Sequence, residues 1–275
     1  MEKVGNNYEK CVELFKWFGE KEELYDVFYA NDYPIPYKGL LIYPVQVDLY
    51  IFFHQLVDCL LLPHLTSGDA KAISMPYFEY LVYLLKEKRQ PQYLWELIQL
   101  LLICLRMKAT DENGRQMIEI VPDGKHYLLR IGNETYDSAD FDKIRKIICE
   151  QNAVEMPDEK THPDIVKAMK EVEEYKRKQA KVKICSFEDQ INIVVAKSSY
   201  KRAECLTMTI RSFTRLLERV DKIMHYEIYT LLSPNLTDEG KKSIEHYMAA
   251  EKTREERYQE NLLDQDEQNQ KIMSV

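Results

Sequence analysis

Apolar residues spaced three and four apart limit the possible folds of this chain more than any other feature. Such a repeat places side chains on one face of an α-helix. The longest example has eight members: Leu206, Ile210, Phe213, Leu216, Leu217, Val220, Ile223 and Met224. Shorter examples predict helices over 8–30, 47–62, 77–85, 91–107, 138–148, 164–181 and 186–195. Only 8 of 275 residues are glycine, which also favours helices over glycine-rich loops.

Two stretches depart from this helical pattern. Residues 117–136 predict three short strands, because Asp123-Gly124 and Gly132-Asn133 are typical hairpin turns. Residues 37–45 predict one extended segment, with Leu41, Tyr43 and Val45 on one side. The predicted fold class is therefore mainly α (α+β): helical, with a small antiparallel β-meander and a charged C-terminal helix.

The positions of prolines and charges predict three parts. They are a helical N-terminal domain over 1–152 with the meander near 117–136, a C-terminal helical domain over 153–235, and a charged helical arm with a polar tail over 236–275. The arm, about 236–263, has few apolar residues, so we expect it to face a partner. Residues 264–275 are polar, and we expect them to be dispensable for folding.

The sequence predicts neither a catalytic nor a ligand-binding centre. It has no CxxC motif, no paired-histidine metal motif, no glycine-rich phosphate loop and no GxSxG motif. The six cysteines lie mostly among apolar residues, which favours buried free thiols in a reducing compartment. We therefore predict no catalytic, cofactor-binding or metal-binding residues, no small-molecule partner, and a protein that is not an enzyme.

Charge and hydropathy restrict the partners further. The formal net charge is -8, and the basic run at 176–183 directly follows acidic residues, so no nucleic-acid partner is expected. The apolar stretch at 97–105 is too short to span a bilayer. The first residues lack the apolar segment of a signal peptide, and no membrane partner is expected.

Three groups of motifs resemble one protein family. The first is YPIPYKGLLIYPV at 33–45 with CLLL at 59–62; the second is YDSADFDKI at 136–144 with IICEQN at 147–152; the third is SFEDQI at 186–191 with LTMTIR at 206–211, LERVD at 217–221 and HYEIY at 225–229. Together they resemble proteins from the tail-morphogenesis regions of phages that infect Gram-positive and anaerobic hosts. The resemblance covers about 33–232 and carries no catalytic residue. It ends where this chain has Ser233-Pro234-Asn235 and the charged arm.

Such proteins are regarded as tail or baseplate assembly factors, including tail assembly chaperones. The resemblance implies a non-enzymatic assembly protein in the host cytoplasm or the virion tail. Its partners would be phage tail proteins or a second copy of the chain. A permanent structural subunit of the tail, neck or baseplate is the alternative, and an enzyme or nucleic-acid-binding protein is a weaker one.

Tyrosine and methionine suit adaptable protein interfaces. The alternative for the tyrosine-rich patches is that they line the core. The candidate interaction residues are Tyr33, Tyr37, Tyr43, Tyr77, Tyr80, Tyr226, Tyr229, Tyr247 and Met248.

Overall fold

The structure is a computed structural model, and it describes most of the chain. The described residues are 2–19, 21–65, 69–158, 165, 167–169, 171–172, 174–175, 185–235, 246–249 and 256. The chain divides into two units. Unit 1 contains Met1–Pro157 and Tyr200–Arg215, and unit 2 contains Asp158–Ser199 and Leu216–Val275.

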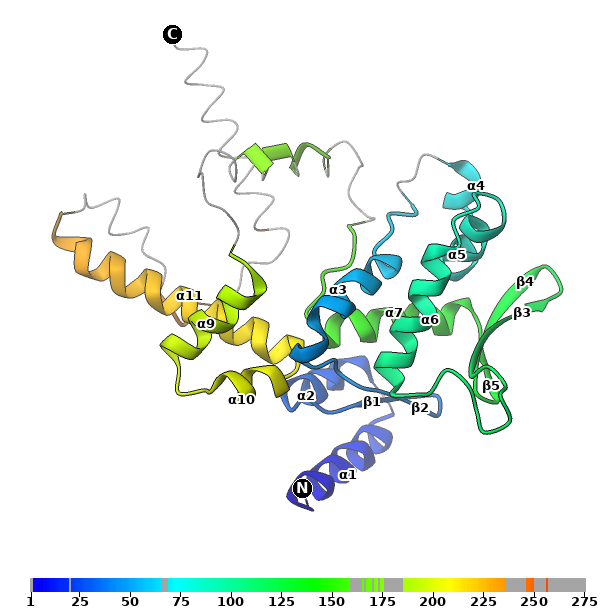
Figure 1. The fold of residues 1–275 in the computed structure, drawn as a ribbon, viewed down its shortest axis with the longest axis horizontal. Helices are drawn as coiled ribbons and strands as arrows, with labels where there is room; N and C mark the ends of the chain where they lie inside the picture. Colours follow the sequence, from blue (N-terminus) through cyan, green and yellow to red (C-terminus); the bar gives the residue numbers. More distant parts are fainter. Residues whose placement is uncertain are drawn as a thin grey trace, which may run out of the picture. The chain divides into compact units, whose positions relative to one another are not determined.

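The predicted fold class is confirmed: the chain is mainly helical with two small antiparallel sheets. The α-helices of the described part are α1 (Glu2–Trp17), α2 (Tyr25–Ala30), α3 (Tyr50–Val57), α4 (Ala70–Ile73), α5 (Tyr77–Lys86), α6 (Gln92–Leu105), α7 (Ser138–Gln151), α9 (Phe187–Lys197), α10 (Arg202–Thr207) and α11 (Ile210–Leu232). The strands are β1 (Ile35–Tyr37), β2 (Leu40–Ile42), β3 (Ile118–Asp123), β4 (His126–Ile131) and β5 (Glu134–Tyr136). Short 3₁₀ turns flank α2, α3 and the end of α11 (Figure 1).

The single helix predicted over 8–30 is wrong, because the chain breaks at Gly19. That residue has a φ of 86°, a left-handed conformation that glycine adopts without steric cost and that ends a helix. α1 therefore stops at Trp17, and α2 follows as a separate helix. Phe15 joins the two, since its ring lies 5.4 Å from Tyr25 and 5.3 Å from Phe28.

The predicted extended segment at 37–45 is instead part of a hairpin. β1 and β2 pair antiparallel, with Tyr37 opposite Leu40. The two turn residues, Lys38 and Gly39, have positive φ values of 42° and 84°. Such a two-residue turn reverses the chain, so the predicted alignment of side chains is wrong: Ile42 is buried and Leu41 is exposed.

The predicted β-meander is confirmed. β3, β4 and β5 form one antiparallel sheet in sequence order. Gly124 and Gly132 each have a φ of 61°, which is why both tight turns carry glycine. Leu129 and Ile131 of β4 face the core.

The core of unit 1 lies among α3, α5, α6 and α7 (Figure 1). Phe141 of α7 stacks on Tyr77 at 6.4 Å and approaches Phe78 at 5.0 Å, joining α5 to α7. Asp137 caps α7 by accepting a hydrogen bond from the backbone N–H of Asp140 at 2.8 Å. The sequence of α6 is apolar nearly all round, a pattern that favours complete burial, but Trp95 is exposed.

In unit 2, α9 begins with a capping box, for which the sequence has the typical pattern of a hydroxyl at Ser186 and a carboxylate three residues later at Asp189. The backbone N–H of Asp189 donates to Ser186 Oγ, and the N–H of Ser186 donates back to the Asp189 carboxylate, both at 3.1 Å. Ile191 and Val194 are buried. The long helix predicted near 209–232 is also confirmed as α11, which Pro234 follows in a 3₁₀ turn. α10 was not predicted.

Much of the predicted C-terminal arm lies outside the described residues. His246–Ala249 form a turn, so the helix predicted over 236–263 is interrupted there, and Glu256 is helical. Residues 176–183 and 264–275 also lie outside the described part. The three-part domain division stays a prediction.

Candidate interaction surface

The start of α11 is attached to the N-terminal part of unit 1 by backbone hydrogen bonds. The N–H of Val47 donates to Met208 O at 2.9 Å, and the N–H of Ile210 donates to Val45 O at 2.8 Å. These bonds flank an isolated antiparallel bridge between Gln46 and Thr209. We call Met208–Ser212 and its contacts the α11 anchor.

Asp32 completes the anchor at the N-terminus of α11. Thr209 is the cap residue, since its Oγ1 accepts a hydrogen bond from the N–H of Ser212 at 3.1 Å. The hydroxyls of Thr209 and Ser212 donate to Asp32 at 2.6 and 2.8 Å. A carboxylate is favourable here because the helix N-terminus carries partial positive charge.

Glu150 at the end of α7 connects the anchor to α2. Arg211 Nη1 donates to Glu150 O at 2.6 Å, and the Tyr29 hydroxyl donates to Glu150 Oε2 at 2.7 Å. Arg211 also lies over the Tyr29 ring, 4.8 Å from its centre. Burial, followed by the bond to Glu150, raises the pKa of Tyr29, so this hydroxyl stays protonated and keeps donating.

Some of the motifs that carry the phage resemblance meet near this anchor, which itself contains part of the LTMTIR motif at 206–211. Gln151 Nε2 donates to Tyr33 O at 3.0 Å, and Asn152 Oδ1 accepts from the N–H of Val45 at 2.9 Å. Tyr37 donates to Asp140 Oδ1 at 2.7 Å. These motif residues therefore hold unit 1 together.

Three of the predicted interaction tyrosines belong to the core. Tyr37, Tyr77 and Tyr80 are buried, and Tyr77 uses its hydroxyl to donate to Cys59 O at 2.9 Å. A second protein cannot reach these rings, so the core alternative describes them. Tyr33 and Tyr43 are half-buried: Tyr33 meets the ring of Tyr8, and Tyr43 lies under Arg106.

The apolar stripe of α11 continues beyond the part that is packed. Along one side of the helix the exposed fraction is 1% at Phe213 and 7% at Val220, but 48% at Ile228 and 79% at Leu231. These positions share a face because they are seven, eight and three residues apart. The same face is therefore core at one end and solvent-exposed at the other.

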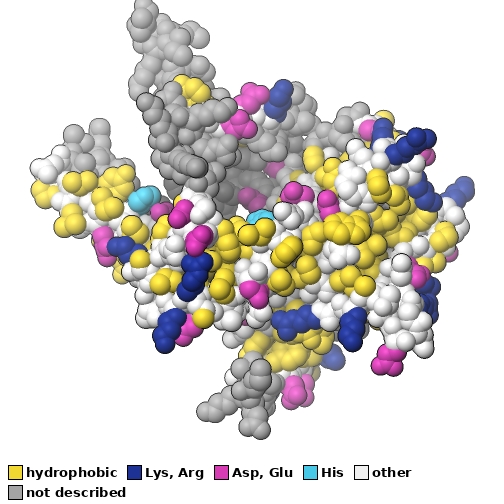
Figure 2. Space-filling model, viewed as in Figure 1, with side chains coloured by type: hydrophobic (Ala, Val, Ile, Leu, Met, Phe, Trp, Pro, Cys, Tyr) yellow, Lys and Arg dark blue, Asp and Glu magenta, His cyan; other side chains and the backbone are white. Residues whose placement is uncertain are grey.

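The last three turns of α11 are also apolar on more than one side. Successive residues are rotated by about 100°, so the apolar residues of these turns point in all directions. They are Ile223, Met224, Tyr226, Ile228, Tyr229, Leu231 and Leu232. Figure 2 shows hydrophobic side chains gathered over this end of the helix. We call these seven residues the α11 tip; a helix that is apolar all round is normally enclosed.

Two further predicted residues, Tyr247 and Met248, lie in the turn His246–Ala249 beside Tyr226. The Tyr226 ring lies 5.4 Å from that of Tyr247 and 5.0 Å from that of His246. Tyr226 is half-buried as a result, whereas Tyr229 is exposed and Met248 protrudes into solvent. The structure thus brings Tyr226 of α11 together with Tyr247 of the turn, and Tyr229 follows Tyr226 by three residues on the helix.

Sequence reasoning missed Ile228, Leu231 and Leu232, although one signal was present. Up to Met224 the apolar residues of α11 keep to one stripe, and beyond it they spread around the helix. It also missed the exposed Ile51 and Phe52 of α3, because the helical spacing of apolar residues over 47–62 includes Ile51 in the apolar face. Periodicity gives the apolar side of a helix but not whether anything covers it.

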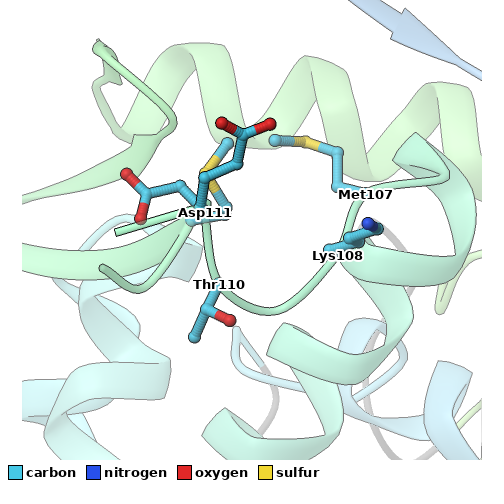
Figure 3. Close-up of a pocket in the computed structure, with 6 residues that line it drawn as sticks. Met107, Lys108, Thr110 and Asp111 are labelled. Carbon is cyan, nitrogen blue, oxygen red and sulfur yellow. The ribbon is translucent and has the colours of Figure 1, made fainter. Parts of the chain in front are cut away.

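A surface pocket is present beside the meander, lined by Met107, Lys108, Thr110, Asp111, Glu112 and Met117. Figure 3 shows the loop from Met107 to Asp111 curving around it. The Asp111 carboxylate accepts hydrogen bonds from the N–H groups of Asn113 and Arg115 at 2.9 and 2.8 Å, so it fixes its own loop. We therefore assign the pocket no chemistry.

The remaining titratable groups of the described part form no metal or thiol site. No cluster of three or more His, Cys, Asp or Glu in the described part is arranged to hold a metal ion. The Cys59, Cys104 and Cys149 thiols are buried, and burial raises the pKa of Cys149 to about 12. Among the described helices, none combines the length and apolar character needed to cross a membrane.

Residues 176–252 match a family model described as the YomV second domain, a phage-derived family of the Bacillus phage SPBc2 region. The match includes α9, α10, α11 and the turn at 246–249, and it covers little more than a quarter of the chain. No curated protein and no solved structure matched the chain in the same comparisons. The family similarity suggests that this is a phage protein.

Proposed function

We propose that this chain is a non-enzymatic phage assembly protein that binds a tail or baseplate component until that component is incorporated. The α11 tip is its contact surface. The observation that carries the proposal is the change along one face of α11, from 1% exposed at Phe213 to 79% exposed at Leu231. Phage origin is supported by the family similarity, and the tail role by the resemblance of the motifs at 33–45, 136–152 and 186–229.

The physical argument concerns solvation. Ile228, Leu231 and Leu232 expose apolar area that costs free energy in water, at about 25 cal/mol per Å². A monomeric protein rarely leaves such residues contiguous unless a partner covers them. A protruding helix end that is apolar all round suits a groove in the partner, as in helix-in-groove recognition. A tail component with such an apolar groove is the partner we propose.

Recovery of the partner from cells that produce phage particles tests this function. Tagged full-length chain should recover a tail or baseplate protein, and the variant Ile228→Glu with Leu231→Glu should recover about tenfold less, which corresponds to about 1.4 kcal/mol. Both positions are exposed, so this variant should fold normally. A tail protein that is not recovered, or is recovered equally by the variant, would contradict the proposal.

The control is a matched pair on another surface. Ile51 and Phe52 of α3 are 59% and 61% exposed, so Ile51→Glu with Phe52→Glu adds the same charges to a similar apolar surface in unit 1. This control should recover the partner normally. Purified particles distinguish the two assembly roles: a chaperone is absent from them, and a permanent structural subunit is present in stoichiometric amounts.

A further inference from the structure

The turn His246–Ala249 packs on one side of α11 through bonds to its backbone. Arg219 Nη1 donates to the carbonyl oxygens of Tyr247 and Ala249 at 2.9 and 3.3 Å, and Lys222 Nζ donates to Ala249 O at 3.2 Å. Arg219, Lys222 and Tyr226 are three and four residues apart, so they form one face of the helix. This face lies on the side opposite Val220, Ile228 and Leu231.

The turn is locally ordered by its own histidine. The N–H of Ala249 donates to His246 O at 2.8 Å, and the N–H of Met248 donates to His246 Nδ1 at 3.2 Å. The rings of His246 and Tyr247 stack at 4.4 Å, and both meet Tyr226. The turn therefore presents two carbonyl groups and two rings to α11 as one preformed unit.

These contacts are of a kind that another peptide segment can replace. Arg219 and Lys222 bind main-chain carbonyls, which every peptide segment has. The two Arg219 bonds lie at the protein surface, where water competes with them. The turn stays in place because it belongs to the same chain, which gives it a high effective concentration. A partner that encloses the α11 tip needs the space that the turn occupies beside Tyr226.

We propose that His246–Ala249 is a latch: it covers the Tyr226 face of α11 in the free protein, and the tail component displaces it when it encloses the helix tip. The displacing group is a peptide segment of the partner that offers carbonyl groups to Arg219 and Lys222 and an apolar side chain to Tyr226. This inference rests on the proposed function for its partner, but the latch itself is a property of the free chain.

Hydroxyl-radical footprinting of the full-length free chain, read by mass spectrometry, tests the latch without any partner. His246→Ala with Tyr247→Ala, and separately Arg219→Gln with Lys222→Gln, should raise oxidation of Tyr226 roughly twofold relative to Tyr229 as the local contact opens. Met248→Ala is the matched control, because Met248 is 71% exposed and should leave the Tyr226 footprint unchanged. Unchanged oxidation of Tyr226 in both double variants overturns the latch.

Partner affinity tests the competition, with the tail protein recovered in the capture experiment as ligand. His246→Ala with Tyr247→Ala leaves α11 intact and should bind about tenfold more tightly, if the latch is closed in about nine molecules of ten. Equal or weaker binding, with the footprint raised, overturns the competition and leaves the proposed function standing. Loss of the partner in Ile228→Glu with Leu231→Glu is a separate readout, so the two proposals fail independently.

Discussion

The two ends of α11 have similar sequences and different surroundings. At the start, Ile210 and Phe213 are buried, and Asp32, Val45 and Glu150 supply polar partners from distant parts of the chain. At the tip, Ile228, Leu231 and Leu232 are exposed. An apolar residue in a helix therefore does not by itself indicate core. What separates the two ends, within the described residues, is polar anchoring: the start is bonded to Asp32, Val45 and Glu150, and near the tip the turn His246–Ala249 is bonded to Arg219 and Lys222 on one side of the helix.

The largest effect we expect is a difference in stability between substitutions at the two ends of α11. Phe213→Ala should lower the free energy of unfolding by about 3–5 kcal/mol, because it leaves a cavity in the core. Leu231→Ala should change it by less than about 0.5 kcal/mol, since the side chain is already in water. Urea unfolding followed by circular dichroism measures both. Similar values for the two variants would mean that the tip is covered in the free protein.

A smaller loss of stability tests the α11 anchor. Asp32→Ala removes the acceptor of the Thr209 and Ser212 hydroxyls and should cost about 1–3 kcal/mol. Asp32→Asn should cost less, because asparagine tolerates the left-handed backbone at this position, where φ is 55°, and keeps one acceptor. Asp48→Ala is the control, since Asp48 is exposed. If the Asp32→Ala protein is as stable as the control, the α11 anchor does not stabilise the start of the helix, and it does not account for the difference between the two ends.

Acid should weaken unit 1 through Asp140. Burial acts to raise the pKa of this carboxyl, but hydrogen bonds from Lys38 and Tyr37 outweigh it, and the folded-state pKa lies below the usual value. A depressed pKa contributes stability above the unfolded-state value, near 3.9, that is lost as pH falls through the folded-state pKa. Unfolding midpoints should therefore drop below about pH 4. In Asp140→Asn the midpoint at pH 7 should be lower and the acid dependence shallower; an unchanged acid profile would contradict this.

Salt should have little effect on partner binding at the tip. Contacts made by Ile228, Leu231 and Leu232 are apolar, and at about 1 M salt the Debye length of about 3 Å screens only charge interactions. Recovery of the tail protein should persist in washes of that strength. Partner release by salt alone would place the main contact on charged residues elsewhere.

The smallest effect concerns the end of the chain. Deleting 264–275 should leave the thermal midpoint unchanged within error, because this polar segment cannot bury enough apolar area to offset its ordering entropy. Differential scanning calorimetry of the two proteins tests this. A clearly lower midpoint would show that this segment contributes to the stability of the fold.

The features predicted from sequence are those that depend on interactions between residues a few positions apart. The turns at Gly124 and Gly132 and the capping box at Ser186 act within a few residues, and they were predicted from sequence. The Asp137 cap of α7 is also local, but only the structure shows it. The hairpin at Lys38-Gly39 was missed because a lysine with positive φ gives no sequence signal.

The interaction surface was less predictable, because it depends on contacts between residues that are far apart in the sequence. The hydrogen bonds from Thr209 and Ser212 to Asp32 join residues 177 and 180 positions apart, and no local sequence pattern predicts them. Burial of Tyr77 and exposure of Leu231 depend on which other elements pack against them. The spacing of apolar residues therefore could not show which of the two side chains is buried. The structure places Tyr226 against Tyr247; that Tyr226, Tyr229, Tyr247 and Met248 bind a partner stays a prediction.

The α11 anchor also bears on synthesis of the chain. Asp32, Val45 and Asn152 leave the ribosome well before Thr209 and Ser212, which complete unit 1. About 60 residues separate Asn152 from Ser212, and at about 5–20 residues per second they take roughly 3–12 s to translate. During that interval the nascent protein has a helical core whose last contacts are missing. Its acceptor groups at Val45 and Asp32 remain open to water, so a slowly translated chain is exposed to misassembly for longer than its native stability would suggest.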